Sequence, residues 1–247
     1  MKRILLLASI SCMLASCDSG NILDKEISVQ ESGKVVKLTA TIDAISDWGG
    51  KYNIALAAFS SDNDYALTQR AIPENTVKGT PVSIVMNNIT SEVSTVELVL
   101  TNKLRKRILT LALMNIDTSK ADGDTIRMDL GTISIDETGC IQNGIFNVAC
   151  IQCHGANGGS AGKLNLTNGN PPACLVDVDA QSSVKDMGYK RIVAGNPDAS
   201  LLYKILCPGG ETILHYNHTE VLSSQFKNNL EEVKSLLYEW IYKTPSH

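Results

Sequence analysis

The chain changes character near residue 137, and this change limits its fold more than any other feature of the sequence. Residues 22–135 contain neither cysteine nor histidine. All four histidines and five of the seven cysteines of the 247-residue chain follow Asp136. Because the two stretches also differ in hydrophobic periodicity, we predict two domains, one over residues 22–136 and one over residues 137–247.

Residues 22–135 carry the period-two pattern of half-buried strands, in which Val36, Leu38, Ala40 and Ile42 alternate with polar residues. The same alternation recurs in residues 52–58, 82–86, 96–100 and 126–130, and turn-forming clusters such as residues 47–50 and 61–64 separate the stretches. About seven or eight short strands at this spacing predict an antiparallel β-sandwich, immunoglobulin- or fibronectin-like in general build. The denser apolar run at residues 107–116 is expected to form a central strand.

The charge balance argues against nucleic acid as a partner. Lysine and arginine number 22 against 26 aspartates and glutamates, so the formal net charge is −4, whereas phosphate binding needs a basic face. One basic cluster lies at residues 103–107 of the β region. It is interpreted as a solvated hairpin turn and strand edge, with contact to an anionic partner as the alternative.

The N-terminus reads as an export signal. Two basic residues precede the mostly apolar residues 4–15, and this apolar run is too short to span a bilayer. The stretch Leu14-Ala15-Ser16-Cys17 resembles a bacterial lipobox, in which the cysteine is acylated. The resemblance implies a signal peptide over residues 1–17 and lipid attachment at Cys17 to a membrane of the cell envelope, facing the periplasm or the exterior. A cleaved signal with an incidental cysteine is the alternative.

Cys150-Ile151-Gln152-Cys153-His154 has the spacing of c-type haem attachment. Two thiols on one helical turn can add to the two vinyl groups on one edge of a haem, and the adjacent histidine can coordinate the iron. A zinc site would need a second pair of ligands, and a thioredoxin-type pair would lie near a βαβ pattern; neither is visible in the sequence. The motif therefore predicts one covalently attached haem c held by Cys150, Cys153 and His154.

The segment around this motif resembles a class I c-type cytochrome domain of bacterial lipoproteins, over about residues 140–247. The likeness is carried by residues 145–155, by the glycine-rich residues 158–166, by residues 191–203 and by Glu239-Trp240-Ile241. Ala194 stands where that family usually has proline. The resemblance implies an all-α domain following the β-sandwich. The residues themselves predict a helix over residues 197–206, with Asn196 as its cap and Pro197 at its first position. They also predict a helix over residues 230–242, in which Val233, Leu236, Leu237, Trp240 and Ile241 form one apolar stripe. The resemblance also implies one-electron exchange with redox partner proteins of the envelope.

The second axial ligand departs from that family, which usually supplies a methionine between its last two helices. The sequence has no methionine after Met187, and the corresponding interval offers His215 and His218 instead. Surface loop histidines are the plainer interpretation of both. We predict His218 as the second iron ligand, with His215 as the alternative, because His218 lies nearer the final helix.

Three further cysteines, Cys140, Cys174 and Cys207, remain in the second region. Cys174 and Cys207 flank residues 191–206, and in an oxidising compartment a disulfide could join them. Free thiols are nearly as well supported, because the sequence does not bring their Cα atoms within bridging distance.

The sequence as a whole predicts an exported, lipid-anchored monohaem cytochrome that carries single electrons. No acid–base pair for substrate chemistry is visible, so an electron carrier is favoured over an enzyme. Two alternatives stay open: a five-coordinate haem sensor or peroxidase-like protein, and a surface binding module in which the β-sandwich acts and the haem is secondary.

Overall fold

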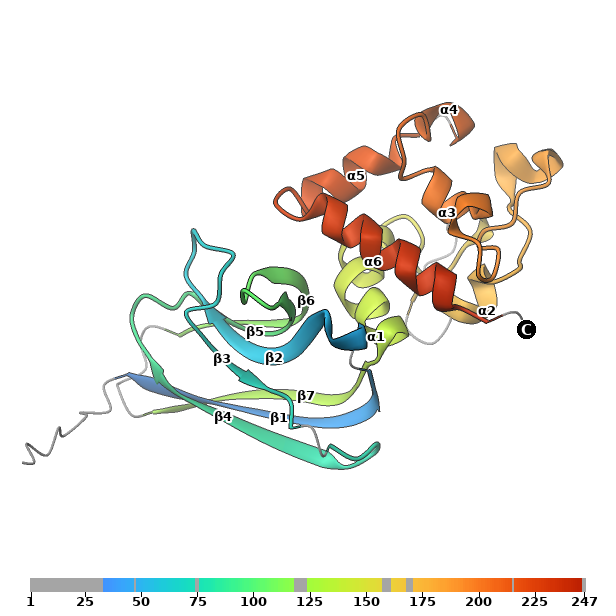
Figure 1. The fold of residues 1–247 in the computed structure, drawn as a ribbon. Helices are drawn as coiled ribbons and strands as arrows, with labels where there is room; N and C mark the ends of the chain where they lie inside the picture. Colours follow the sequence, from blue (N-terminus) through green and yellow to red (C-terminus); the bar gives the residue numbers. More distant parts are fainter. Residues whose placement is uncertain are drawn as a thin grey trace, which may run out of the picture. The chain divides into compact units, whose positions relative to one another are not determined.

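The alternating sequence of the first region forms seven strands arranged in two sheets (Figure 1). The structure is a computed structural model, and it describes residues 33–46, 48–73, 76–117, 124–156, 161–167, 171–214 and 216–245. The strands are β1 (Lys34–Ile45), β2 (Tyr52–Phe59), β3 (Thr68–Ala71), β4 (Pro81–Ile89), β5 (Thr95–Asn102), β6 (Arg107–Asn115) and β7 (Thr125–Ile135).

The three-stranded sheet, in the order β4-β1-β7, departs from the predicted antiparallel arrangement. β1 pairs antiparallel with β4 but parallel with β7, so that Val36 lies opposite Ile126 and Leu38 opposite Met128. The prediction of a purely antiparallel sandwich is therefore wrong. The alternating pattern fixes which side chains face the core, and that condition is met by either strand direction.

The four-stranded sheet has the order β3-β2-β5-β6, which places the dense apolar run of residues 107–116 at an edge. The prediction of a central strand is wrong for β6. Ile108 and Leu109 are nevertheless buried, because the chain after residue 137 packs against this strand. A helical cover is one of the ways in which proteins protect an exposed strand edge.

The second region is not an all-α cytochrome c domain, and that part of the predicted fold class is wrong. The chain as described is mainly β-sheet, and most helical pieces after residue 137 are short. The α-helices are α1 (Glu137–Ile141), α2 (Pro171–Leu175), α3 (Leu201–Lys204), α4 (Glu211–Leu214), α5 (His218–Gln225) and α6 (Leu230–Lys243). A π-helix, η2 (Gln142–Cys150), continues α1, and 3₁₀ turns include η3 (Ala161–Lys163) and η5 (Pro197–Ala199).

The helix predicted over residues 197–206 shows why the all-α prediction fails. Its start is confirmed, since the Asn196 side chain accepts from the backbone N–H of Ala199 and Pro197 occupies the first turn. Ser200 then adopts an extended backbone (ψ 124°) and separates η5 from α3. The Ser200 hydroxyl accepts from the N–H of Val193 (2.8 Å) and donates to the carbonyl of Asn196 (2.8 Å). Tertiary bonding at this one buried residue overrides the local preference for helix.

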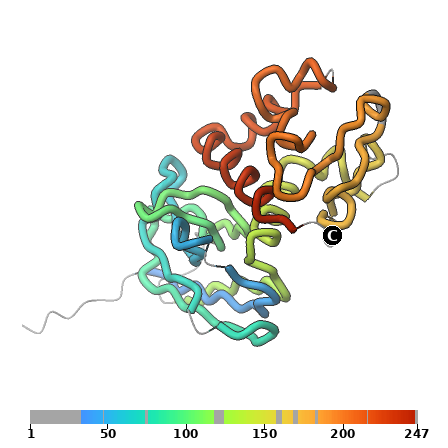
Figure 2. Tube along the Cα trace, turned by 45° about the vertical axis from the view of Figure 1, so that its right-hand side comes forward, coloured from blue at the N-terminus to red at the C-terminus, as the bar shows by residue number. Residues whose placement is uncertain are grey.

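The final helix agrees with its prediction. α6 buries one stripe, and its buried residues are Val233, Leu236, Leu237, Trp240 and Ile241. Both views show α6, in red, alongside α1, in yellow-green (Figures 1 and 2). The Trp240 indole N–H donates to the Thr138 hydroxyl at 3.1 Å, and its ring packs edge-on against Phe146.

One apolar core passes through both regions, although β7 ends and α1 begins at the predicted boundary near residue 136. Gly144 of η2 approaches Leu109 of β6 so closely that a Cβ at position 144 would lie 2.8 Å from the Leu109 Cβ. Lys106 also pairs with Glu232 of α6 at 3.2 Å. The helical region is therefore packed directly on the edge of the four-stranded sheet.

Candidate functional site

The Cys-x-x-Cys-His motif forms a single turn at the end of η2. The backbone N–H groups of Cys153 and His154 both donate to the carbonyl of Cys150, at 3.2 and 3.0 Å. These bonds continue the helical winding past Cys150 and place both thiols and the histidine on one turn, as haem attachment requires. Gly155 follows in close contact with the backbone, since a Cβ there would lie 2.6 Å from the carbonyl oxygen of Ile151.

The two thiols of this turn differ in exposure. Cys153 is exposed, whereas Cys150 is half-buried. Burial raises the pKa of the Cys150 thiol to about 12, and the neighbouring Cys153 adds to the effect. Reactive or metal-binding thiolates need a lowered pKa, so this environment disfavours thiolate chemistry. A thioether carries no ionisable group, and burial does not oppose its formation.

The imidazole of His154 is held by the chain that follows it. Its Nδ1 lies 2.9 Å from the carbonyl oxygen of Ala161. Because a carbonyl oxygen only accepts, Nδ1 carries the proton and Nε2 is left with its lone pair. Burial lowers the pKa of His154, the Ala161 carbonyl opposes this shift, and His218 and Arg191 lower the pKa further. The neutral ring with a free Nε2 is the form that binds metals.

His218 lies opposite His154, with ring centres 6.4 Å apart and ring planes inclined by 16°. It is the first residue of α5, whose N-terminus is capped by the Asn217 side chain. Its Nδ1 lies 3.2 Å from the carbonyl of Tyr216, so its Nε2 is also left with a lone pair. Burial lowers its pKa, against the opposing effect of the Tyr216 carbonyl.

The two rings lie near each other, and both are neutral imidazoles with an Nε2 that could serve as a metal ligand. Histidine ligands also commonly donate the other ring N–H to a backbone carbonyl, as both rings do here. The chemistry of these two side chains therefore suits the ligands of a haem iron. Among the described residues, no group of three or more His, Cys, Asp or Glu side chains converges as a metal site.

Comparisons with known proteins give no family for this chain: no family model, no curated protein and no solved structure matches it. Within the described part of the chain, no helix is long and apolar enough to cross a membrane.

Several predicted residues fall outside this cluster. Cys17, together with residues 1–17, and His215 lie outside the described residues. The structure holds Cys174 and Cys207 as free thiols, and their pairing stays a prediction. The Cys174 thiol donates to the carbonyl of Asn165 at 3.1 Å. Cys140 is a fully buried residue of α1, and burial raises the pKa of its thiol to about 12.

Sequence reasoning missed the groups that hold the two histidines. These are the carbonyls of Ala161 and Tyr216, and Arg191 bonds the carbonyl of Gly162 next to Ala161. No local pattern reveals which backbone carbonyl a ring will meet. Arg191 lies in a segment that the family resemblance singled out, but its contacts depend on the tertiary fold.

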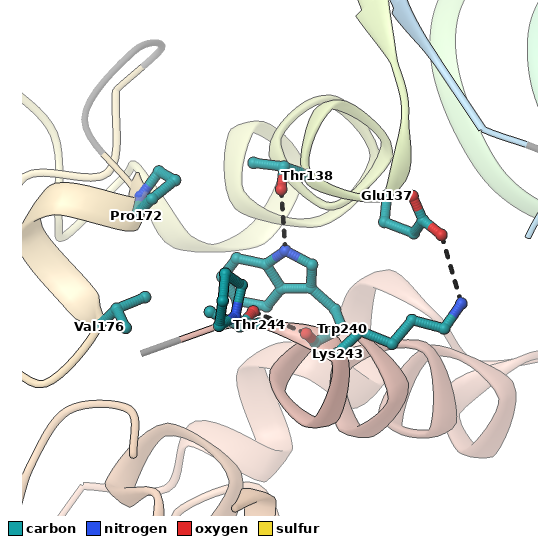
Figure 3. A pocket seen from close by; sticks show the side chains of 8 residues that line it. Glu137, Thr138, Pro172, Val176, Trp240, Lys243 and Thr244 are labelled. Atoms are coloured by element: carbon teal, nitrogen blue, oxygen red, sulfur yellow. Dashed lines mark hydrogen bonds and ion pairs between the residues drawn. The ribbon is translucent and has the colours of Figure 1, made fainter. Parts of the chain in front are cut away.

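A cavity of about 350 Å³ lies apart from these residues, at the start of α1 and the end of α6 (Figure 3). Its walls hold an ion pair between Glu137 and Lys243 at 3.3 Å, and Thr244 donates to the Trp240 carbonyl. It is lined by Glu137, Thr138, Pro172, Val176, Trp240, Lys243, Thr244 and Pro245. None of these side chains is a cysteine or histidine, so the cavity does not belong to the candidate site.

Proposed function

We propose that this chain attaches one haem c through Cys150 and Cys153, with His154 and His218 as the axial iron ligands, and carries single electrons. The observation that supports this most is the facing pair of imidazoles, each with Nδ1 on a backbone carbonyl and Nε2 left with its lone pair. One ring of the pair comes from the Cys-x-x-Cys-His turn and the other from the start of α5.

When bound, the haem supplies an iron that accepts and releases one electron. The chain's own residues determine the conditions of that exchange. The Ala161 and Tyr216 carbonyls fix the tautomer of each ring and make each ligand more electron-donating. Two imidazoles lack the rise in potential that a methionine ligand gives, so a low reduction potential is expected.

The proposal extends to the place of action, a membrane of the cell envelope reached by export and held through lipid on Cys17. Several acyl chains, at about 0.8 kcal/mol per buried CH₂, give durable attachment. Its partners would be redox proteins that face the same compartment. Cys17→Ala should move the protein from the membrane fraction to the soluble fraction, as seen by immunoblotting of fractionated cells. Wild-type protein that is already soluble would contradict the anchor.

Haem staining of a denaturing gel tests the attachment. The full chain, produced with the haem-attachment machinery, should stain, and Cys150→Ala combined with Cys153→Ala should abolish the stain. Cys174→Ala combined with Cys207→Ala is the matched control, because it removes the same number of thiols outside the motif. The proposal fails if the first double variant still stains or if the wild-type chain never does.

A further inference from the structure

The guanidinium of Arg191 bonds the backbone of two other segments of the chain. It donates through Nη1 to the carbonyl of Cys174 at 2.7 Å. Through Nη2 it donates to the carbonyls of Gly162 at 2.9 Å and Lys163 at 3.2 Å. One planar fork thus joins α2 and η3, which are separate segments of the chain.

The backbone of η3 is arranged to present these carbonyls. Gly162 and Lys163 both have left-handed dihedral angles, with φ of 63° and 53°. Lysine rarely adopts this conformation, so its surroundings must hold it there. The guanidinium of Arg191 supplies such a constraint, because it binds the carbonyls of both residues.

The same turn carries the group that orients His154. Ala161, next to Gly162, accepts from the His154 ring, and its N–H donates to the Cys153 carbonyl at 3.1 Å. A shift of η3 would therefore move the acceptor of the His154 Nδ1–H. His218 has no such link, since its acceptor belongs to Tyr216, two residues before it.

We propose that Arg191 is a positioning residue for His154: by fixing the carbonyls of η3 it holds the Ala161 oxygen on Nδ1 and keeps Nε2 available to a metal. The assignment of that metal as haem iron rests on the proposed function, whereas the link from Arg191 to the ring does not. Lysine at this position keeps the positive charge but lacks the planar fork that reaches three carbonyls.

The test measures hydrogen exchange of the two histidine Nδ1–H groups by NMR, in the full chain. If the wild-type protein stains for haem, it is studied in the ferrous low-spin state; if it does not, the haem-free protein is used. Arg191→Lys should speed exchange at His154 at least tenfold and leave His218 unchanged. Lys190→Gln is the control, because it removes the adjacent cation, whose partner Asp179 is exposed.

The proposal is overturned if Arg191→Lys leaves the exchange rate of the His154 Nδ1–H unchanged. It is also overturned if the exchange rate rises equally at His154 and His218. If the variant does not fold, the proposal is tested on the wild-type protein by the temperature at which each proton begins to exchange. On warming, the Arg191 guanidinium protons and the His154 Nδ1–H should begin to exchange together, at a lower temperature than the His218 Nδ1–H. Separate onsets for Arg191 and His154 overturn the proposal. A missing haem stain refutes the proposed function without affecting these outcomes.

Discussion

The two regions of this molecule are held together in different ways. Residues 34–135 are joined by strand ladders, and β5, paired on both sides, buries six of its eight residues. The described part of residues 137–245 shares the apolar core, and several of its links are single side chains that bind backbone carbonyls. Gln142, for example, donates to the Leu166 carbonyl at 2.9 Å, and Arg191 donates to three carbonyls.

This difference shows where a bound group would matter. A ladder repeats the same bond along the strand, so its stability does not depend on one residue. In the described part of the second region, cross-links such as these are each made by one side chain. A group attached to Cys150 and Cys153 and bound by His154 and His218 would add cross-links there, and binding to the folded form alone is stabilising.

The largest expected effect is a change of iron spin state that is confined to the second region. If the chain carries the proposed haem, His218→Ala should convert its ferric iron from low-spin to high-spin, because one of the two proposed iron ligands is lost. His215→Ala is the control and should leave the absorption spectrum unchanged. The β region should keep its amide protection in both variants. The assignment of His218 fails if only the His215 change alters the spin state, or if neither does.

The second prediction tests the contact between the regions. Leu109→Ala should lower the free energy of unfolding by about 2–5 kcal/mol, because Leu109 is fully buried. Gly144→Ala should lower it by about 1–3 kcal/mol, since the new Cβ crowds Leu109. Denaturant unfolding checks both values. The double variant should lose somewhat less than the sum, because Leu109→Ala removes the Cδ1 and Cγ contacts at 3.1 and 3.3 Å but keeps the Cβ that lies 2.8 Å from the new methyl group. Strict additivity would show that the Cγ and Cδ1 contacts do not contribute to the crowding.

The third prediction compares the regions without haem. In Cys150→Ala combined with Cys153→Ala, amide protection in residues 171–214 should fall at least about tenfold, because local stability depends on local cross-links. Protection in β2 and β5 should stay the same. Hydrogen exchange followed by mass spectrometry gives both values in one experiment. An equal loss in the two β strands would mean that the regions unfold as one.

The smallest effect concerns the ion pair shown in Figure 3. Burial acts to raise the pKa of Glu137, but hydrogen bonds from Ser46, its own backbone N–H and Lys243 outweigh it, and the pKa is lowered from 4.5. The carboxylate therefore stabilises the fold above pH 4.5, and this contribution is lost as pH falls through the lowered value. Glu137→Gln should cost less than about 1 kcal/mol at neutral pH, and the cost should disappear once pH falls below the lowered pKa. An equal cost on both sides of that pKa would contradict the role of the charge.

The sequence predicted the elements whose hydrophobic pattern repeats along the chain. It missed the contacts that single residues make with distant segments. The alternation at Val36, Leu38, Ala40 and Ile42 gave β1 its buried face, but it could not indicate that β7 pairs parallel with it. The stripe of α6 was predicted for the same reason. Between residues 151 and 217 the all-α expectation rested on the family resemblance and on one helix predicted from its cap, over residues 197–206, which Ser200 interrupts.

The candidate site divides in the same way. Cys150, Cys153 and His154 are contiguous, so their common turn follows from spacing alone. His218 was named from its distance to the final helix, and the structure places its ring opposite His154, although its role as an iron ligand stays a prediction. The carbonyls behind both rings depend on how distant segments meet, which no local pattern encodes.

The parallel pairing of β1 with β7 has a consequence for the order of folding. β2, β5 and β6 can pair with close neighbours in the chain, but the three-stranded sheet needs its first and last strands to meet across the whole β region. Such distant contacts form late, because loop-closure entropy opposes them. α1 begins directly after β7, so the docking of β7 also brings η2 to the edge of β6. We expect the Cys-x-x-Cys-His turn to reach its final position against β6 only after β7 has docked, as one of the last steps of folding.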